Sequence, residues 1–283
     1  MKRRAVTLLA VLALGASVLT AAPAAAAEDL PPGAPYVAIG DSEAAGTGNL
    51  PYVDQGCLRS AKSYPMLLGS MLGGVASKAC AGATTTDVIA TQLGDIGPAT
   101  QLVTVTAGVN NLGWQEVLAA CSSAGNATDC ATEKNDALVA LQGVPMGIAQ
   151  IVGAVRMRAL GAMIVVTGYP ELFGDTTRTC SVGAYQGTPV KFTAQQAREV
   201  NVGLLGVNAA VKAGVDAYKL QTGDPGVTFV DVVPGFDGHG LCDTGDRWIS
   251  GLASGKATSD KGFHPNVAGQ QAYARIVGTA IGL

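Results

Sequence analysis

Two short stretches, far apart in the chain, carry residue types that together make a nucleophile and its base. Segment 36–46 (YVAIGDSEAAG) begins as an apolar run typical of a buried strand and stops abruptly at Gly-Asp-Ser, which places Ser42 on the loop leaving that strand. Segment 260–266 (DKGFHPN) places His264 just ahead of the last predicted helix. A serine hydroxyl needs a base within hydrogen-bond reach to act as a nucleophile. The pair therefore indicates acyl transfer, with Ser42 as the nucleophile and His264 as the base.

Each of these residues also has a simpler interpretation. Ser42 could serve only as the cap of a helix that starts there, and His264 could be an ordinary surface histidine. The second histidine, His239, lies in a Gly-His-Gly segment with no apolar element nearby, so His264 is the favoured base. The Gly-x-Ser-x-Gly elbow of α/β-hydrolases is absent around Ser42, which disfavours that fold.

Two further segments carry groups that could stabilise an oxyanion. Gly82 follows a predicted strand at 75–80 and offers an unobstructed backbone N–H, and Asn110 follows a predicted strand at 102–107 and offers a side-chain amide. Either segment taken alone reads as a plain turn. Both follow the carboxyl end of a strand, as Ser42 does, and open α/β sheets bind their ligands at that edge.

The intervening elements alternate in a way that predicts a parallel sheet covered on both faces. Apolar, β-branched runs predict five strands, which are 36–39, 75–80, 102–107, 163–167 and 227–232. Helical spacing predicts helices at 63–72, 84–93, 112–120, 129–160 (broken near 143–145), 193–218 and 266–281. We therefore expect a five-stranded, flavodoxin-like α/β fold. The long segments 168–192 and 234–259 show little periodicity, and a bridge from Cys180 to Cys242 would join them into one wall of a cleft.

The first 27 residues have the pattern of a secretory signal peptide. Three basic residues (2–4) precede an apolar run (5–20) and a tract of small residues (21–27), with cleavage expected near Ala27. The apolar run is too short for a membrane anchor, and no later stretch resembles a transmembrane helix. We expect a secreted, extracellular protein that forms a single domain over 28–283 and acts as a monomer.

Charge and cysteine content restrict the partners and the compartment. The whole chain carries −3, and the signal segment holds three bases and no acid, so residues 28–283 are near −6. This balance argues against nucleic acid and against anionic lipid surfaces as partners. Six cysteines in an oxidising compartment predict disulfides, for which the sequence alone allows 15 connectivities. A metal site is disfavoured because no Cys-x-x-Cys pair occurs and the chain has two histidines.

The ordered segments resemble the four sequence blocks of the GDSL (SGNH) hydrolase family. Gly40-Asp41-Ser42 matches the nucleophile block, Gly82 the glycine block, Gly108-x-Asn110 the third block and His264-Pro-Asn the base block. The cysteine layout is similar to that of the family's secreted Streptomyces-type lipases, esterases and phospholipases A1. The resemblance implies a three-layer α/β/α sandwich, hydrolysis of carboxylic esters, and an oxyanion hole made by the N–H groups of Ser42 and Gly82 and the side chain of Asn110.

The same resemblance, together with the ease of closing short loops, favours sequential pairing of the cysteines. The expected disulfides are Cys57–Cys80, Cys121–Cys130 and Cys180–Cys242.

Three positions depart from the family pattern. Glu43 stands where leucine is usual, and would be harmless if exposed but would disfavour anionic substrates if it pointed at the cleft. Asn111 replaces an aspartate, which removes a charge and keeps hydrogen bonding. Asp260 lies four residues before His264 rather than three, with Lys261 in the usual place. Either Asp260 reaches the imidazole through a bulged loop, or a backbone carbonyl near Lys261 or Gly262 orients the ring.

We therefore expect a serine esterase or lipase that needs no metal or organic cofactor and acts on a small-molecule or lipid ester. The rival within enzymes is a carbohydrate acetylesterase, which the aromatic content of 5% disfavours because few rings are present for sugar stacking. Acyl transfer to an acceptor other than water is a variant of the same chemistry. From another class, a non-catalytic exported binding protein would be expected to lack the nucleophile, the base or an oxyanion donor.

Overall fold

The computed structural model describes residues 33–253 and 260–283, so the expected signal peptide lies outside the described residues. Its centre is a five-stranded parallel sheet in the order β4-β1-β5-β6-β9. The strands are β1 (Tyr36–Gly40), β4 (Ala76–Ser77), β5 (Leu102–Thr106), β6 (Met163–Thr167) and β9 (Val227–Val230). In chain order this is 2-1-3-4-5, the flavodoxin-like arrangement, so the predicted fold is confirmed.

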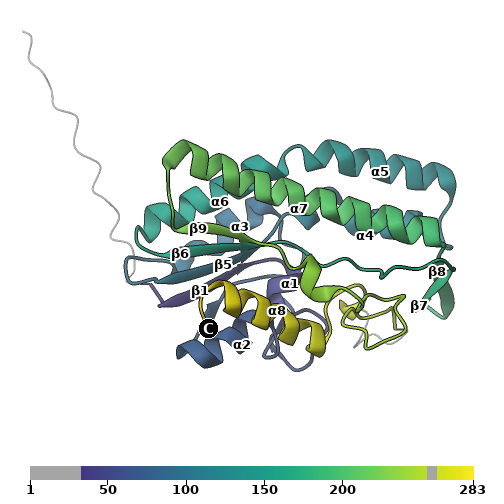
Figure 1. The fold of residues 1–283 in the computed structure, drawn as a ribbon, viewed down its shortest axis with the longest axis horizontal. Coiled ribbons are helices and arrows are strands. Elements are labelled where there is room, and N and C mark those ends of the chain that lie inside the picture. The colour runs from purple at the N-terminus through teal and green to yellow at the C-terminus, as the bar shows by residue number, and fades with distance from the viewer. Residues whose placement is uncertain (1–32, 254–259) are drawn as a thin grey trace, which may run out of the picture.

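Helices cover both faces of the sheet, in three layers (Figure 1). One face carries α2 (Tyr64–Leu72) and α8 (Val267–Ala280). The other carries α3 (Thr85–Thr91), α6 (Val144–Arg158) and α7 (Ala194–Thr222). Two more helices, α4 (Trp114–Ala120) and α5 (Ala127–Leu141), extend that second layer. The short helices are α1 (Ser42–Ala45), η1 (Leu93–Asp95), η2 (Val109–Leu112) and η3 (Val233–Phe236). Two antiparallel strand pairs lie outside the main sheet. One pairs β2 (Tyr52–Asp54) with β3 (Arg59–Ser60), and the other pairs β7 (Cys180–Tyr185) with β8 (Thr188–Phe192).

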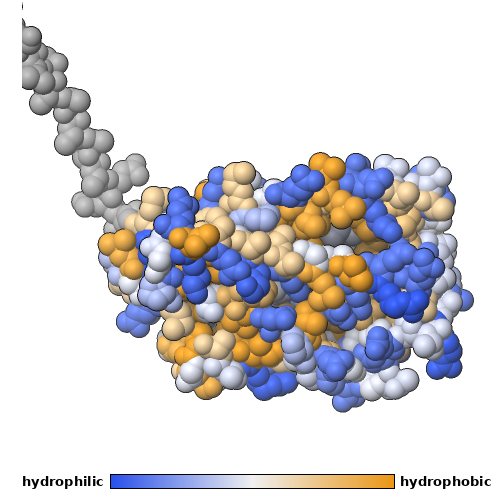
Figure 2. Space-filling model, turned by 45° about the horizontal axis from the view of Figure 1, so that its top comes forward, coloured by the Kyte–Doolittle hydropathy of each residue, from blue (hydrophilic) through white to orange (hydrophobic). Residues whose placement is uncertain are grey.

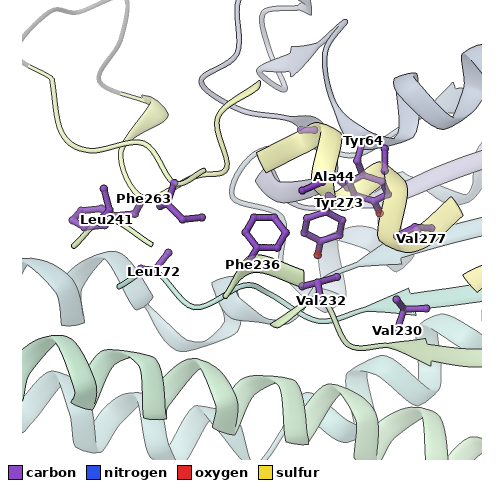
Figure 3. Packing of buried hydrophobic residues seen from close by; sticks show 14 of the residues in the cluster. Ala44, Tyr64, Leu172, Val230, Val232, Phe236, Leu241, Phe263, Tyr273 and Val277 are labelled. Atoms are coloured by element: carbon purple, nitrogen blue, oxygen red, sulfur yellow. The ribbon is translucent and has the colours of Figure 1, made fainter. Parts of the chain in front are cut away.

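The two-residue period of the strands divides the core. In β1, Tyr36 and Ala38 face α2 and α8, whereas Val37 and Ile39 face the opposite helices. On the α8 side the ring of Tyr273 stacks on Tyr64, with centroids 4.6 Å apart, and Phe236 meets Tyr273 edge-on (Figure 3). Both faces of the sheet are therefore buried, as its near-continuous apolar strands require.

Three disulfides fix the loops around this frame. They follow the sequential order that was expected, namely Cys57–Cys80, Cys121–Cys130 and Cys180–Cys242. The last bridge joins the β7–β8 hairpin to the loop after η3, across 62 residues of chain. Among the described residues, no single helix is long and apolar enough to cross a bilayer, although α5 and α6 pass that test as a pair, across a bend of 41°.

Candidate active site

The sheet order brings the predicted site residues to one edge. Strands β1 and β5 are neighbours, yet they connect to opposite sides of the sheet, which makes the space beyond their carboxyl ends the crevice where such folds bind ligands. Ser42 follows β1 directly, Asn110 lies in η2 just after β5, and Gly82 lies in the loop after β4. Three residues that are far apart in the sequence therefore lie beyond the carboxyl ends of three neighbouring strands, at one edge of the sheet.

The turn at Ser42 is shaped by its neighbours. Gly40 has φ +137°, and a Cβ there would lie 2.0 Å from the Thr106 carbonyl oxygen, so only glycine fits. Asp41 caps α1, and its carboxylate accepts a hydrogen bond from Glu43 N at 3.0 Å. Ser42 is the first residue of that helix, where a backbone N–H has no partner inside the helix. Ser42 is buried, with 5% of the residue exposed.

The loop that carries His264 packs directly on the loop that follows Ser42. The side-chain amide of Asn49 donates to the Pro265 carbonyl at 2.9 Å, and a Cβ on Gly48 would lie 2.4 Å from Lys261 Cα. The side-chain amide of Gln270, in the first turns of α8, donates to the Glu43 carbonyl at 3.1 Å. These contacts bring the Ser42 and His264 loops together across more than 200 residues of sequence.

The imidazole of His264 is buried and meets the edge of the Trp114 ring, with centroids 5.7 Å apart. Burial lowers its pKa from 6.5 to about 4, while the nearby carbonyls of Gly262 and Asp260 and the charge of Asp260 act in the opposite direction. Neither ring nitrogen has a partner with hydrogen-bond geometry among the described residues, and that includes Ser42 Oγ and the Asp260 carboxylate. Such bonds are often long in unliganded enzymes and tighten when substrate binds.

The other histidine is engaged elsewhere. The ring of His239 stacks on Trp248 at 3.5 Å, and its Nδ1 lies 2.7 Å from the Asp246 carbonyl oxygen. Its side chain is therefore held by its own loop.

Asn110 is held so that one amide hydrogen is left over. The indole of Trp114, which can only donate, bonds to Asn110 Oδ1 at 3.0 Å and so fixes which way the amide points. One hydrogen on Nδ2 donates to the Ala83 carbonyl at 3.0 Å. The adjacent Gly82 is exposed, with φ +81°, and its turn is pinned by the bond from Ala81 N to the Cys57 carbonyl at 3.0 Å.

The departure at Asn111 has a clear structural role. Its Oδ1 accepts from Thr85 N at 3.0 Å, and its Nδ2 donates to Thr85 Oγ1 at 2.9 Å. Hydrogen bonding is retained at this position without a charge, as expected. The pair ties η2 to the first turn of α3, and so steadies the element that carries Asn110.

The departure at Glu43 takes neither form that the sequence suggested. Its side chain is 6% exposed, and Oε2 is buried without a partner among the described residues. Burial, and then the charge of Asp41, raise the pKa of Glu43 well above its usual range. Burial also raises the pKa of Asp41 to about 7, although Tyr169 donates a hydrogen bond of 2.6 Å to it. The turn at Ser42 thus rests on two buried carboxyl groups.

Sequence reasoning missed three residues that hold the site. Trp114 contacts both His264 and Asn110. Tyr169 joins the Ser42 turn to η2, because its hydroxyl donates to Asp41 and accepts from Val109 N at 3.2 Å. Gln92 brackets Gly40, accepting from its N–H at 2.7 Å and donating to its carbonyl at 2.9 Å. No local pattern marks these residues, since their roles depend on contacts between distant segments.

Comparison with known proteins gives a consistent result. Residues 38–272 match the model of the GDSL-like Lipase/Acylhydrolase family. A lipase of Streptomyces rimosus is 30% identical, with 99% of each chain covered. The crystal structure of an extracellular lipase from that organism superposes with a TM-score of 0.73 at 30% identity, covering 87% of this chain and 98% of the other. A phospholipase A1 from Streptomyces albidoflavus gives a TM-score of 0.74 at 27% identity, covering 86% and 98%. The chain therefore belongs to the GDSL-like lipase/acylhydrolase family.

Proposed function

We propose that the protein is an exported serine hydrolase that cleaves carboxylic esters of lipids or simple alcohols. The observation that carries the proposal is the meeting of the Ser42 and His264 loops beside an asparagine amide that is locked in orientation. The names of the relatives, lipase and phospholipase A1, support a lipid ester as the substrate. The disulfides, the signal-like segment 1–27 and an extracellular relative support export.

The residues take the following roles in this mechanism. Ser42 Oγ attacks the ester carbonyl carbon while His264 accepts its proton. The oxyanion of the tetrahedral intermediate accepts hydrogen bonds from the N–H groups of Ser42 and Gly82 and from the remaining amide hydrogen of Asn110. Collapse expels the alcohol, which takes the proton from His264, and leaves an acyl-enzyme. Water then attacks with the same base, and the acid is released. One oxyanion donor of this kind is typically worth about 3–4 kcal/mol of barrier lowering.

His264 needs no ionised partner to be neutral, because burial already holds its pKa low. Its orientation is then a matter of the carbonyls of Gly262 and Asp260, with the Asp260 carboxylate as an auxiliary group. We therefore propose Asp260 as a positioning residue of modest weight.

The test is turnover of p-nitrophenyl esters, from acetate to palmitate, by the oxidised protein. We expect Ser42→Ala to lose activity by several powers of ten, whereas Ser70→Ala, at an exposed serine on α2, keeps it. The chain-length profile separates a lipase from a short-chain esterase. Equal rates for wild type and Ser42→Ala would refute the proposed nucleophile, and a well-folded protein without activity would favour acetylated polysaccharides or a binding role.

A further inference from the structure

A large apolar cavity lies next to the candidate site, between η2 and the helices α4, α5 and α7. It has a volume of about 720 Å³ and opens between α5 and α7, with α4 behind them. Apolar side chains make up most of its wall, including Leu112, Trp114, Leu118, Leu138, Leu141 and Val200. Figure 2 shows hydrophobic side chains around a hollow on this face of the molecule. Protein interiors fill almost all such space with side chains, and this volume falls in the range of pockets that bind small molecules.

The helix α5 covers this cavity without filling it. None of the residues of α5 is buried, and Leu138 is 60% exposed. The helix is attached at its start by the Cys121–Cys130 disulfide and, across the mouth, by a 2.8 Å ion pair from Lys134 to Glu199 on α7. The helix α5 is therefore attached at its start and across the mouth of the cavity, and the apolar space beneath it is open. Such a space is a site for a ligand that supplies the missing packing.

The distribution of polar groups indicates the class of that ligand. The charged residues of the wall are Lys134, Arg198 and Glu199, on the two helices that frame the mouth. Trp114 is the one aromatic residue among the lining residues, and the polar side chains of the lining lie on α5 and α7, so a sugar would find a single stacking platform and few polar partners. An apolar interior with a charged rim suits an unbranched hydrocarbon chain that ends in a small polar or anionic group.

Trp114 connects this cavity to the candidate active site. Its indole lines the cavity, meets His264 edge-on at 5.7 Å and donates to Asn110 Oδ1 at 3.0 Å. Val109, the residue before Asn110, also lines the cavity. We infer that the cavity between α4, α5 and α7 binds a single unbranched acyl chain, in contact with Trp114. The inference rests on the proposed function only for the source of the chain, which is either the substrate itself or the free fatty acid.

Binding can be measured without catalysis because the chain has two tryptophans, Trp114 and Trp248. In the Ser42→Ala, Trp248→Phe protein, fluorescence reports Trp114 alone. We expect a fatty acid brominated along its chain, kept below its micellar concentration, to quench this fluorescence saturably, since heavy-atom quenching requires contact. If Trp248→Phe does not fold, the Ser42→Ala protein with both tryptophans is titrated instead.

Two glycine substitutions locate the bound chain. A Cβ on Gly206 of α7 would lie 3.8 Å from Leu141 Cδ2 inside the cavity, so Gly206→Leu fills it. The matched control is Gly153→Leu on α6, where the nearest atom is Tyr218 Cε2 at 3.7 Å, outside the cavity. Both changes favour the helix. We expect Gly206→Leu to raise the dissociation constant measured by quenching about tenfold, because displacing about two methylenes is worth about a power of ten in affinity. Gly153→Leu should leave it unchanged.

A second arm identifies the source of the chain. In the Trp248→Phe protein with Ser42 intact, a bromoalkyl sulfonyl fluoride reacts at Ser42. The oxygen–sulfur bond forms, fluoride leaves, and the hydroxyl proton passes to His264. Quenching of Trp114 by the tethered chain assigns the cavity to the substrate's own acyl chain. Quenching by the free acid alone assigns it to a separate fatty-acid site.

The outcomes keep the two proposals apart. A protein that hydrolyses no ester but shows quenching sensitive to Gly206→Leu would refute the proposed function and support the cavity site. No quenching in either arm, or quenching that Gly206→Leu leaves unaltered, would overturn the cavity site whatever the activity.

Discussion

The buried carboxyl of Glu43 should make the stability of the protein fall as the pH rises. We consider Glu43→Gln, which keeps the shape of the side chain and replaces the titratable carboxyl group with an amide. In the folded protein the pKa of Glu43 is raised well above its ordinary 4.5, first by burial and then by the Asp41 charge. Between the ordinary and the raised value, the unfolded chain releases a proton that the folded protein keeps. Folding stability is then fully present at low pH and is lost as the pH rises through this window.

The magnitude follows from proton linkage. One retained proton lowers the free energy of unfolding by about 1.4 kcal/mol per pH unit. Asp41, whose pKa is raised from 3.8 to about 7, acts in the same direction over that interval. His264 acts in the opposite direction between about 4 and 6.5, because its folded-state pKa is lowered. Both contributions are common to wild type and variant, so they cancel in the difference. The stability of Glu43→Gln relative to wild type should therefore rise with pH between pH 5 and pH 7, at no more than the slope of one retained proton.

The assay is equilibrium unfolding in urea at pH 5, 6 and 7, with the disulfides intact. Midpoints are converted to free energies with the measured slope for each protein, and equal slopes show that the comparison is of stability. Glu116→Gln, at an exposed glutamate on α4, controls for the loss of a carboxylate as such. A stability difference that stays constant across the three pH values would refute the burial of a protonated Glu43. The absolute difference in stability at any single pH also contains the change in hydrogen bonding, so the prediction concerns only how that difference varies with pH.

Three further predictions concern the base and the oxyanion hole. For His264, kcat/KM should rise with pH as the imidazole becomes neutral, with an apparent pKa near 4, and an inflection at 6.5 or above would contradict its burial. Asp260→Asn should lower kcat only a few-fold, because we propose that the nearby carbonyl groups of Gly262 and Asp260 also orient the His264 ring. A loss of thousands-fold, with the near-ultraviolet circular dichroism unaltered, would make the carboxylate essential. Trp114→Phe removes the bond to Asn110 Oδ1, and because such a bond is worth about 1 kcal/mol, we expect kcat for a short ester to fall about fivefold with KM little affected. An unchanged kcat would show that the amide needs no such support.

The sheet and most of the helices are predictable from the sequence because the signals there are local and agree with one another. The strand 163–167 has the predicted bounds, and the break near 143 appears as the division between α5 and α6. Thr193 caps α7 through a capping box, as its position suggested. The helix continues to Thr222, beyond the predicted end, because a left-handed glycine at Gly223 terminates it.

The antiparallel pair β7–β8 was missed within the segment 168–192. Its strands pair with each other rather than with the main sheet, and Gly183 interrupts their alternation with a register shift. Their inward side chains, Val182, Val190 and Phe192, are buried in the core, but Gly183 and Pro189 fall within the two strands and weaken the strand signal in the sequence. The Cys180–Cys242 bridge adds a covalent attachment to this packing, and the prediction that the two long loops are joined is confirmed.

The difference between local sequence signals and contacts made by distant segments also explains what the sequence could and could not predict of the site. The grouping of Ser42, Gly82 and Asn110 could be predicted because topology alone places the ends of adjacent strands together. The protonation states of His264, Asp41 and Glu43 could not be predicted, because they depend on burial by distant segments. Burial shifts the pKa of His264 downward and those of Asp41 and Glu43 upward, and each shift favours the uncharged form.

A single physical cause, burial, therefore keeps the proposed base His264 neutral and keeps the two carboxyl groups at the Ser42 turn largely protonated below about pH 7. Glu43, which would repel an anionic headgroup if it pointed into the crevice, is instead turned into the core, where Gln270 holds its backbone carbonyl. For the proposed function, we expect ester substrates with anionic and neutral headgroups to be distinguished by the fit of their chains rather than by charge at the Ser42 turn. Discrimination would then fall to surfaces such as the cavity behind Trp114, where apolar area is available and the charges lie at the rim.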